Sequence, residues 1–312
     1  MLQIFHNTNF DFMGRRKFAY LFSATLIVLS TVSLVLHGGP RLGIDFTGGT
    51  LMQVRFAQTA PMSDIRSAVD EAGFTGTELQ AINNTNDIMI RIHQREAGAD
   101  PFGRVNLALQ KKFPGNKVTL LRQENVGPKI GKELGTKAMQ AICFSLGMIL
   151  IYIAIRYEWK FALGAVLALA HDVYITLGLI SIFDKEFTLT VMAALLTIAG
   201  YSNNDTIVVL DRIRERAKVL RREALAHVIN LSVNETLSRT VITSLTVTLA
   251  VLALFLFGGE VIHDFSFAML VGVVFGTYSS VYVASALALD ITLMRMKDTT
   301  VASGGKKAPA KG

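Results

Sequence analysis

Three ionisable residues lie within or at the edge of apolar runs in this sequence: Asp172, Asp205 and Arg239. An ionisable side chain at the centre of a membrane-spanning helix costs about 2.5 kcal/mol or more, so it normally faces a partner or a water-filled cavity. Burial favours the neutral form of a carboxylate, and a nearby arginine favours the charged form. Carboxylates beside an arginine within a membrane therefore predict a proton carrier, whose proton moves when the arginine moves.

The depth of these residues can be estimated from the helical rise of about 1.5 Å per residue. Asp172 falls near the midplane of its run. Asp205 lies about 27 Å from Phe187, and Arg239 lies about 28 Å from Gly258 on the same side of the membrane. The two depths agree, and the short connection between the two runs would allow Asp205 and Arg239 to meet.

Helical phase adds supporting residues to this candidate site. At about 100° per residue, Tyr201 shares the helix face of Asp205, while Glu235 and Thr243 share the face of Arg239. Hydroxyl and small residues on such faces are suited to hydrogen bonds between helices. The site is therefore expected to include polar neighbours on both helices.

Some of the same residues could instead have a purely structural role. Arg239 could reach the membrane surface or pair with Glu235 one turn away, and Arg212 could neutralise Asp205 along one helix. Neither alternative applies to Asp172, which has no basic residue one turn away. His171 is expected to point elsewhere and to make one packing hydrogen bond.

The composition indicates the kind of element that positions these residues. The chain has 312 residues, of which 51% are hydrophobic and 18% are charged, whereas soluble domains carry about 25% charged residues. Six runs are near the length of about 20 apolar residues that a bilayer helix needs. We therefore predict a polytopic α-helical membrane protein with six transmembrane helices, at residues 18–36, 138–155, 160–183, 187–210, 240–258 and 265–289.

Basic residues in the short connections predict the orientation. They precede the first run, flank the connection between the second and third, and fill residues 211–238. Because short basic loops remain on the cytoplasmic side, both termini are expected there. Residues 1–17 would be a cytoplasmic N-terminus, 211–238 a cytoplasmic basic loop and 295–312 a flexible basic tail. The first run is too long for a signal peptide and is interpreted as a retained anchor.

One long insertion, residues 40–132, separates the first two runs. Its hydrophobic pattern predicts the order β-α-β-β-α-β, which is typical of a ferredoxin-like α+β domain. The predicted strands are 51–56, 77–83, 87–93 and 117–123, and the predicted helices are 63–73 and 101–113. The orientation of the spans would place this domain on the periplasmic side.

The sequence lacks the motifs of several kinds of enzyme. Residues 127–133, GPKIGKE, do not have the spacing of a phosphate-binding loop, and no zinc-protease, serine-hydrolase or dinucleotide motif occurs. A single cysteine, Cys143, excludes an intrachain disulfide. We expect no enzyme activity, no metal and no cofactor. The basic excess is explained by topology rather than by nucleic-acid binding.

Four ordered motifs carry a resemblance to a known family. They are GIDFTGGT (43–50), LAHDVYITLG (169–178), GYSNNDTIVVLDRIRE (200–215) and NETLSRTVITSLTV (234–247). They are similar to the motifs of the SecD/SecF family of bacterial protein-export subunits, and with the six runs they cover nearly the whole chain. Asn203 and Leu210 depart from the family pattern without touching a residue to which a role is given.

This resemblance implies an architecture like half of a resistance-nodulation-division permease, with SecD as the other half. It implies a subunit of the bacterial inner membrane that uses the proton-motive force to help exported, unfolded polypeptide leave the SecYEG channel on the periplasmic side. YajC and, functionally, SecA would be further partners. The implied proton path contains Asp205, Arg239 and Asp172, with Tyr201, Asn204, Glu235 and Thr243 in support.

The GIDFTGGT motif has two interpretations. The resemblance implies that Gly43, Asp45, Gly48 and Gly49 shape the base of the periplasmic domain. Alternatively, Gly48 and Gly49 form only a turn and Asp45 is a local cap. Two other functions also fit the buried charges: a small-molecule exporter, and a scaffold that only stabilises its partner subunits.

Overall fold

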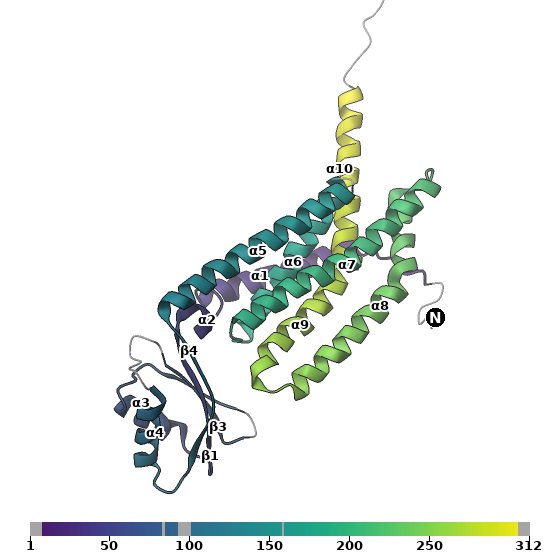
Figure 1. Ribbon diagram of the computed structural model, residues 1–312. Helices are drawn as coiled ribbons and strands as arrows, with labels where there is room; N and C mark the ends of the chain where they lie inside the picture. The colour runs from purple at the N-terminus through teal and green to yellow at the C-terminus, as the bar shows by residue number, and fades with distance from the viewer. Residues whose placement is uncertain (1–7, 83–84, 93–100, 158, 305–312) are drawn as a thin grey trace, which may run out of the picture. The chain divides into compact units, whose positions relative to one another are not determined.

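The computed structural model describes residues 8–82, 85–92, 101–157 and 159–304 (Figure 1). Within it the chain forms two compact units. One contains residues 42–141 and 186–189, and is called the α/β unit. The other contains residues 1–41, 142–185 and 190–312, and is called the helical unit.

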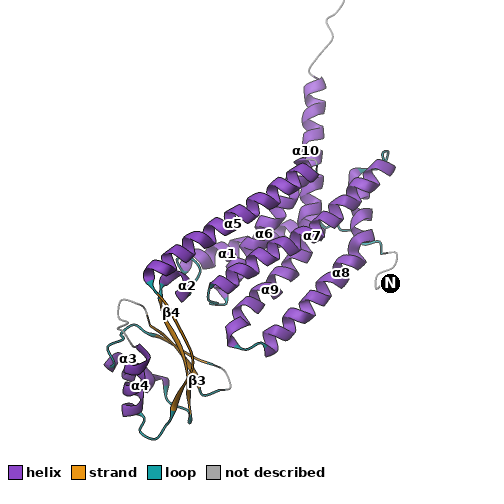
Figure 2. Ribbon diagram, in the orientation of Figure 1, coloured by secondary structure: helices purple, strands orange, loops and turns teal. Residues whose placement is uncertain are grey.

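The α/β unit contains one antiparallel sheet of four strands in the order β2-β3-β1-β4. The strands are orange in Figure 2. The strands are β1 (Gly49–Phe56), β2 (Glu78–Ala81), β3 (Asp87–Ile92) and β4 (Val118–Val126). The longer helices are α3 (Met62–Glu71) and α4 (Pro101–Lys112), and one turn, α2 (Ile44–Thr47), precedes β1. The predicted order β-α-β-β-α-β is therefore observed, while His93, the last residue of the third predicted strand, lies outside the described residues.

The core of this unit comes from the apolar faces of its helices and strands. Val54 and Ile90 of the sheet are fully buried against Ile65 of α3 and Leu109 of α4. In α3 and α4, the apolar residues recur every three to four positions, which directs one face of each helix to the sheet. Burial of these side chains stabilises the unit by about 25 cal/mol for each Å² of apolar surface removed from water.

The helical unit is built from long helices. They are α1 (Arg16–Leu36), the larger part of α5 (Pro128–Arg156), α6 (Trp159–Ile182), nearly all of α7 (Leu189–Val219), α8 (Leu225–Phe257), α9 (Glu260–Tyr278) and α10 (Ser285–Gly304). A π-helical segment, η1 (Ser279–Ala284), joins α9 to α10.

Five helical segments among the described residues are long and apolar enough to cross a membrane. They are α1, α5, most of α6, α8 and the continuous α9–η1–α10 segment from Val261 to Met294. The chain is thus a multi-pass membrane protein. The α7 helix is not among the five, because polar residues from Tyr201 to Asp205 interrupt its apolar run.

Close helix contacts in the helical unit depend on small residues. A Cβ atom added at Gly178 of α6 would lie 2.0 Å from Ser30 Oγ of α1. A Cβ atom at Gly272 of α9 would lie 2.2 Å from Ile198 Cδ1 of α7. Glycine at these two positions lets the helix backbones approach, as is usual between helices in membranes.

Two expectations about connections were wrong. Residues 211–238, expected to form a loop, are helical except for residues 220–224, because this stretch is rich in helix formers and in ion pairs such as Arg212–Glu215. The tail expected at 295–312 is helical as far as Gly304, the last residue that the structure describes. Residues 1–7 and 305–312, expected at the two cytoplasmic ends, lie outside the described residues.

Candidate functional site

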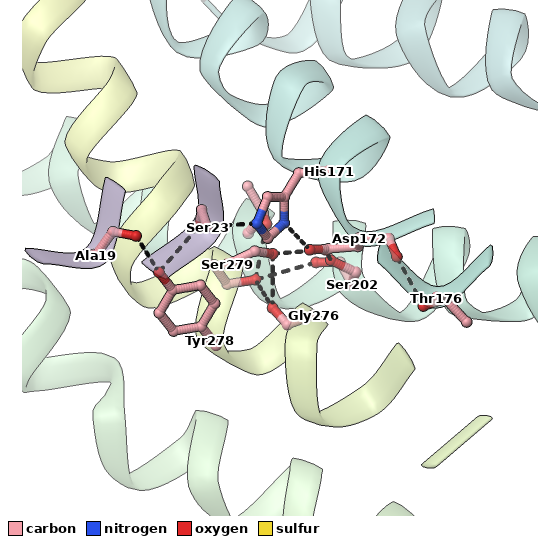
Figure 3. Close-up of polar contacts among 11 residues, drawn as sticks. Ala19, Ser23, His171, Asp172, Thr176, Ser202, Gly276, Tyr278 and Ser279 are labelled. Carbon is pink, nitrogen blue, oxygen red and sulfur yellow. Dashed lines mark hydrogen bonds and ion pairs between the residues drawn. The ribbon is translucent and has the colours of Figure 1, made fainter. Parts of the chain in front are cut away.

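The first buried carboxylate, Asp172, lies on α6 and is fully buried. Its Oδ2 accepts hydrogen bonds from Ser202 Oγ of α7 at 2.5 Å and from Ser279 Oγ of η1 at 2.6 Å (Figure 3). Three helical elements therefore meet at one carboxylate oxygen. A buried charge is tolerated when its lone pairs are satisfied in this way.

The sequence places these serines where the helices can approach closely. Gly276 lies one turn before Ser280, and a Cβ atom on it would lie 3.7 Å from Asp172 Oδ2. The wide π-helical turn that begins at Ser279 presents this serine to Asp172 and Ser280 to Thr206, whose hydroxyls are 2.9 Å apart. π-helical turns are rare and occur mostly at functional sites.

The other oxygen of Asp172 contacts the neighbouring imidazole. His171 Nδ1 lies 2.9 Å from Asp172 Oδ1, and His171 Nε2 lies 3.0 Å from Ser23 Oγ of α1 (Figure 3). The expectation that His171 points elsewhere was therefore wrong. Adjacent residues of a helix differ in direction by about 100°, but here the two side chains turn toward each other and their ends meet.

The hydrogen-bond chain fixes where one proton lies. Tyr278 OH donates to Ala19 O at 2.8 Å, so the Ser23 hydroxyl, 3.0 Å from Tyr278 OH, must donate to it. Ser23 Oγ then accepts from His171, which places a hydrogen on Nε2. The close contact between Nδ1 and Asp172 Oδ1 requires a second hydrogen between them. The His171–Asp172 pair thus holds one proton that either group can carry.

The second buried carboxylate, Asp205, lies on α7 and is 5% exposed. Its Oδ1 accepts a hydrogen bond from Thr240 Oγ1 of α8 at 3.1 Å. Its Oδ2 is buried and has no hydrogen-bond partner among the described residues. One oxygen of this carboxyl is therefore available to a proton.

Arg239 does not form an ion pair with Asp205 within the described part of the chain. Its side chain is exposed, and its positive charge acts on Asp205 without a hydrogen bond. Glu235 pairs with Arg212 and Arg216 of α7, so the alternative pairing of Arg212 with Asp205 is not observed.

The remaining residues of the predicted site are only partly brought together. Tyr201 OH donates to Ser244 Oγ at 3.4 Å, and Ser244 in turn lies 2.6 Å from Thr277 Oγ1. Thr243 donates to backbone oxygens of its own helix, and Asn204 is exposed. Neither of the last two contacts Asp205 in the hydrogen bonds described.

Several site residues escaped the sequence analysis, and two signals could have identified them. Ser202 lies three positions before Asp205 and four positions before Thr206, so all three fall near one helix face. Residues 276–280, GTYSS, form a cluster of small and hydroxyl residues in an otherwise apolar run. The missed residues are Ser23, Ser202, Thr206, Thr240, Tyr278, Ser279 and Ser280.

The motif at residues 43–49 belongs to the α/β unit, whereas both buried carboxylates belong to the helical unit. Gly48 and Gly49 adopt φ angles of 73° and 144°, which favour glycine. Asp45 Oδ2 accepts from the backbone nitrogen of Leu189 at 2.8 Å, so its cap is on α7 rather than local. Gly43 donates to the backbone oxygen of Phe187 at 2.9 Å.

Comparison with known proteins identifies the family to which this chain is similar. Residues 106–294 match the family model described as "Protein export membrane protein SecD/SecF, C-terminal", and residues 34–60 match the SecD/SecF GG motif. The chain is 44% identical over 299 residues to a protein translocase subunit SecF of Gemmatimonas aurantiaca, covering 93% of this chain and 90% of that protein. It is 48% identical over 288 residues to a SecF subunit of Magnetococcus marinus, covering 90% and 92%.

Solved structures give the same result. The fold matches SecDF, a translocon-associated membrane protein from Thermus thermophilus, with a TM-score of 0.82 and 39% identity over 94% of this chain. It also matches SecDF in a super-membrane-facing form, with a TM-score of 0.70 and 38% identity over 96% of this chain. The chain spans 39% and 41% of those two SecDF chains. It belongs to the SecD/SecF family of protein-export membrane proteins, among the SecF subunits of the protein translocase.

Proposed function

We propose that this chain acts with SecD in protein translocation by using the proton-motive force to promote release and forward movement of exported polypeptide. Asp205, Arg239 and Asp172 form its proton path. The observation that carries the proposal is the buried contact between His171 Nδ1 and Asp172 Oδ1, in a helical unit that also buries Asp205. Such groups within membrane helices mark ion pathways and proton relays.

Each carboxyl has a defined part in this proposal. Asp205 takes a proton on its unpartnered Oδ2, while Thr240 remains hydrogen-bonded to Oδ1 in both states. The exposed charge of Arg239 favours the deprotonated form, so moving Arg239 away favours proton uptake. Asp172 exchanges its proton with His171 and is held by Ser202 and Ser279.

The proposed setting follows from the family and from the helix pattern. The chain would lie in the bacterial inner membrane with six spans, α7 included, and with both termini in the cytoplasm. The α/β unit, whose strand order and antiparallel pairing are compatible with a ferredoxin-like domain, would be periplasmic. Partners would be SecD and SecYEG, with YajC and SecA in the same machinery. No enzyme activity or nucleic-acid binding is proposed.

Export into membrane vesicles that contain this chain, SecD and SecYEG tests the proposal. We expect Asp205→Asn and Arg239→Ala each to abolish the part of export that depends on the proton gradient, with complex assembly unchanged. Asp184→Asn is the matched control, because Asp184 is exposed, lies outside the buried sites and has a φ of 49° that asparagine tolerates. Unchanged export in both site variants would reject the proton path and leave a scaffold role.

A further inference from the structure

The buried residues of α1 are all small or carry a hydroxyl group. Large apolar side chains of the same helix, such as Leu21 and Val28, are exposed. Buried positions that recur every three to four residues, or every seven, lie on one face of a helix. The helix thus turns its small face toward the helical unit, as helices do in membranes. The buried residues are Ala19, Ser23, Ser30 and Ser33.

Ser23 lies between two aromatic side chains of other helices. His171 Nε2 of α6 and Tyr278 OH of α9 are each 3.0 Å from Ser23 Oγ (Figure 3). The ring of Tyr278 packs edge-on against Phe22 and stacks with Tyr282, with centroid distances of 5.4 and 5.5 Å. These ring contacts fix the position of the Tyr278 hydroxyl, which in turn fixes the hydrogen of Ser23.

The hydrogen bonds through Ser23 end on a backbone carbonyl. Tyr278 OH donates to Ala19 O at 2.8 Å, so the Ser23 hydroxyl donates to Tyr278 OH. The Nε2–H of His171 then donates to Ser23 Oγ. A backbone carbonyl accepts a hydrogen bond but does not carry a proton away. This branch therefore orients His171 and does not conduct protons.

The orientation decides what the other ring nitrogen can do. With a hydrogen on Nε2, neutral His171 presents a lone pair on Nδ1 to Asp172 Oδ1, 2.9 Å away. A proton can pass from Oδ1 to Nδ1, which leaves a carboxylate and an imidazolium whose Nε2–H stays on Ser23. The other neutral tautomer carries its hydrogen on Nδ1. It can only donate to Asp172 and cannot take its proton.

We propose that Ser23 and Tyr278 are positioning residues for the buried pair: they hold His171 in the tautomer whose Nδ1 can accept a proton. The α1 helix, which the sequence presents only as an anchor, is then part of the site. Both residues act on the carboxyl through the imidazole. This inference rests on the proton path proposed above, in which Asp172 exchanges its proton with His171.

The first experiment observes the tautomer directly. Solid-state NMR of the full chain in lipid bilayers, with isotope-labelled histidine, shows which ring nitrogen carries hydrogen, and His171→Gln identifies the His171 signals by their loss. We expect hydrogen on Nε2 in the parent chain. Tyr278→Phe keeps the ring contacts but lets the Ser23 hydroxyl donate to Nε2 instead. The hydrogen should therefore move to Nδ1 in a large part of the molecules.

Tyr174→Phe is the matched control. Tyr174 OH of α6 lies 2.8 Å from Thr31 Oγ1 of α1, so this variant also removes one hydroxyl contact between the two helices. The described hydrogen bonds of His171 do not include Tyr174, and the hydrogen should stay on Nε2. An unchanged tautomer in Tyr278→Phe would overturn the proposal, and so would an equal change in Tyr174→Phe, which would indicate only looser packing of α1.

The second experiment measures export in the vesicles described above. Tyr278→Phe and Ser23→Ala are each expected to lower gradient-dependent export severalfold, with assembly with SecD unchanged. Ser23→Thr keeps the hydroxyl and should retain most of the export, as should Tyr174→Phe. Export at the parent level in both Tyr278→Phe and Ser23→Ala would contradict a positioning role.

The outcomes separate this inference from the proton path. If Asp205→Asn leaves export unchanged, the proton path fails, while the NMR measurement still decides whether Ser23 and Tyr278 hold the tautomer of His171. If Asp205→Asn abolishes gradient-dependent export but Tyr278→Phe changes neither the tautomer nor export, the proton path stands and the positioning role is rejected.

Discussion

At the scale of single residues, the His171–Asp172 pair has a testable consequence. Because the two groups share one proton, removing either should abolish the same step. We expect His171→Ala and Asp172→Asn to reduce gradient-dependent export to a similar extent, and the double variant to be no worse than either single variant. Export kinetics in vesicles measure this non-additivity.

Thr197→Ala is the control for this comparison of single and double variants. Thr197 is exposed on α7, and among the described contacts its hydroxyl donates a hydrogen bond only to the backbone of its own helix. Additive losses in the double variant of His171 and Asp172 would show that the two residues act separately.

A second prediction at this scale concerns pH and the α/β unit. The Arg55 guanidinium hydrogen-bonds Asp87 at 2.6 and 2.8 Å and holds the pKa of that carboxyl below its usual value. A depressed carboxyl pKa adds stability above its unfolded value of about 3.9, and that stability disappears as the pH falls through the folded pKa. Asp87→Asn should therefore destabilise the sheet at pH 7.

Hydrogen exchange of β1 and β3 amides in the full chain measures this effect. Exchange should be faster in Asp87→Asn than in the parent chain at neutral pH. The difference should begin to shrink below about pH 3.9 and should vanish only when the pH is below the lower, folded pKa of Asp87. A difference that persists in acid would assign the stabilisation to packing and not to the charge of Asp87.

The sequence identified both buried aspartates but not their partners. Their positions followed from an apolar run of known length, since the rise per residue gives depth. The serines around Asp172 could not be predicted, because they come from α7 and η1, and the meeting of three elements depends on tertiary packing. His171 was misplaced because helical phase describes the direction of the Cβ atom and not the reach of a long side chain.

At the scale of elements, the segment before α1 is held by two asparagines of α8. Asn230 and Asn234 each donate to Phe10 O, and their Oδ1 atoms accept from backbone nitrogens of Phe12 and Phe10 respectively. Phe12 and Met13 are buried in the same core as α8. The start of α1 is thereby joined to α8 several residues before Thr240.

Replacement of both asparagines by alanine should release this segment. Each lost hydrogen bond contributes about 1 kcal/mol, so the amides of residues 10–13 should exchange at least about fivefold faster in the double variant. Asn106→Ala on α4, in the other unit, should leave that exchange unchanged. Equal protection in the double variant would mean that Phe12 and Met13 alone hold the segment.

The contact between α1 and α6 yields a steric prediction. A Cβ atom on Gly178 would overlap Ser30, so Gly178→Ala should destabilise the protein by about 1–3 kcal/mol, the usual range for overpacking. Gly147→Ala on α5 is the matched control, because no atom lies within 4 Å of that Cβ position. Thermal unfolding in detergent measures both variants, and equal melting temperatures would contradict this close contact.

Periodicity predicted the helices and strands well, but their ends poorly. The charged stretch after Leu210 looks like a loop because it is polar, yet Arg212 and Arg216 bond to Glu235 and keep both helices extended. Polarity marks exposure to water and does not exclude a helix. Likewise, α5 begins at Pro128, ten residues before the predicted span, because proline is favoured in the first turn of a helix.

At the scale of the whole molecule, α8 leaves polar groups uncovered. Arg239 and Thr246 are exposed on α8, and the chain spans only about two fifths of the SecDF chains that it matches. Because an exposed charge in a membrane helix needs a partner, we expect this face to contact SecD. A photoreactive amino acid at Thr246 should crosslink to SecD in the assembled complex.

The same photoreactive residue at exposed Val28, on α1, tests the specificity of that crosslink. Equal crosslinking from both positions would contradict a partner face on α8. The arrangement of the whole complex could not be predicted from one chain, since the sequence shows which faces are polar but not what covers them.

The π-helical turn at Ser279–Ala284 has a mechanical consequence. Such a turn contains one residue more than an α-helical turn. Its conversion to α-helix would rotate α10 by about 100° and shift it by about 1.5 Å relative to α9 without breaking either helix. The same conversion would break two contacts at once: the hydrogen bond from Ser279 to Asp172 and the contact between Ser280 and Thr206. The extra residue of η1 would therefore let a rotation of α10 change the hydrogen bonding of the buried Asp172 carboxyl.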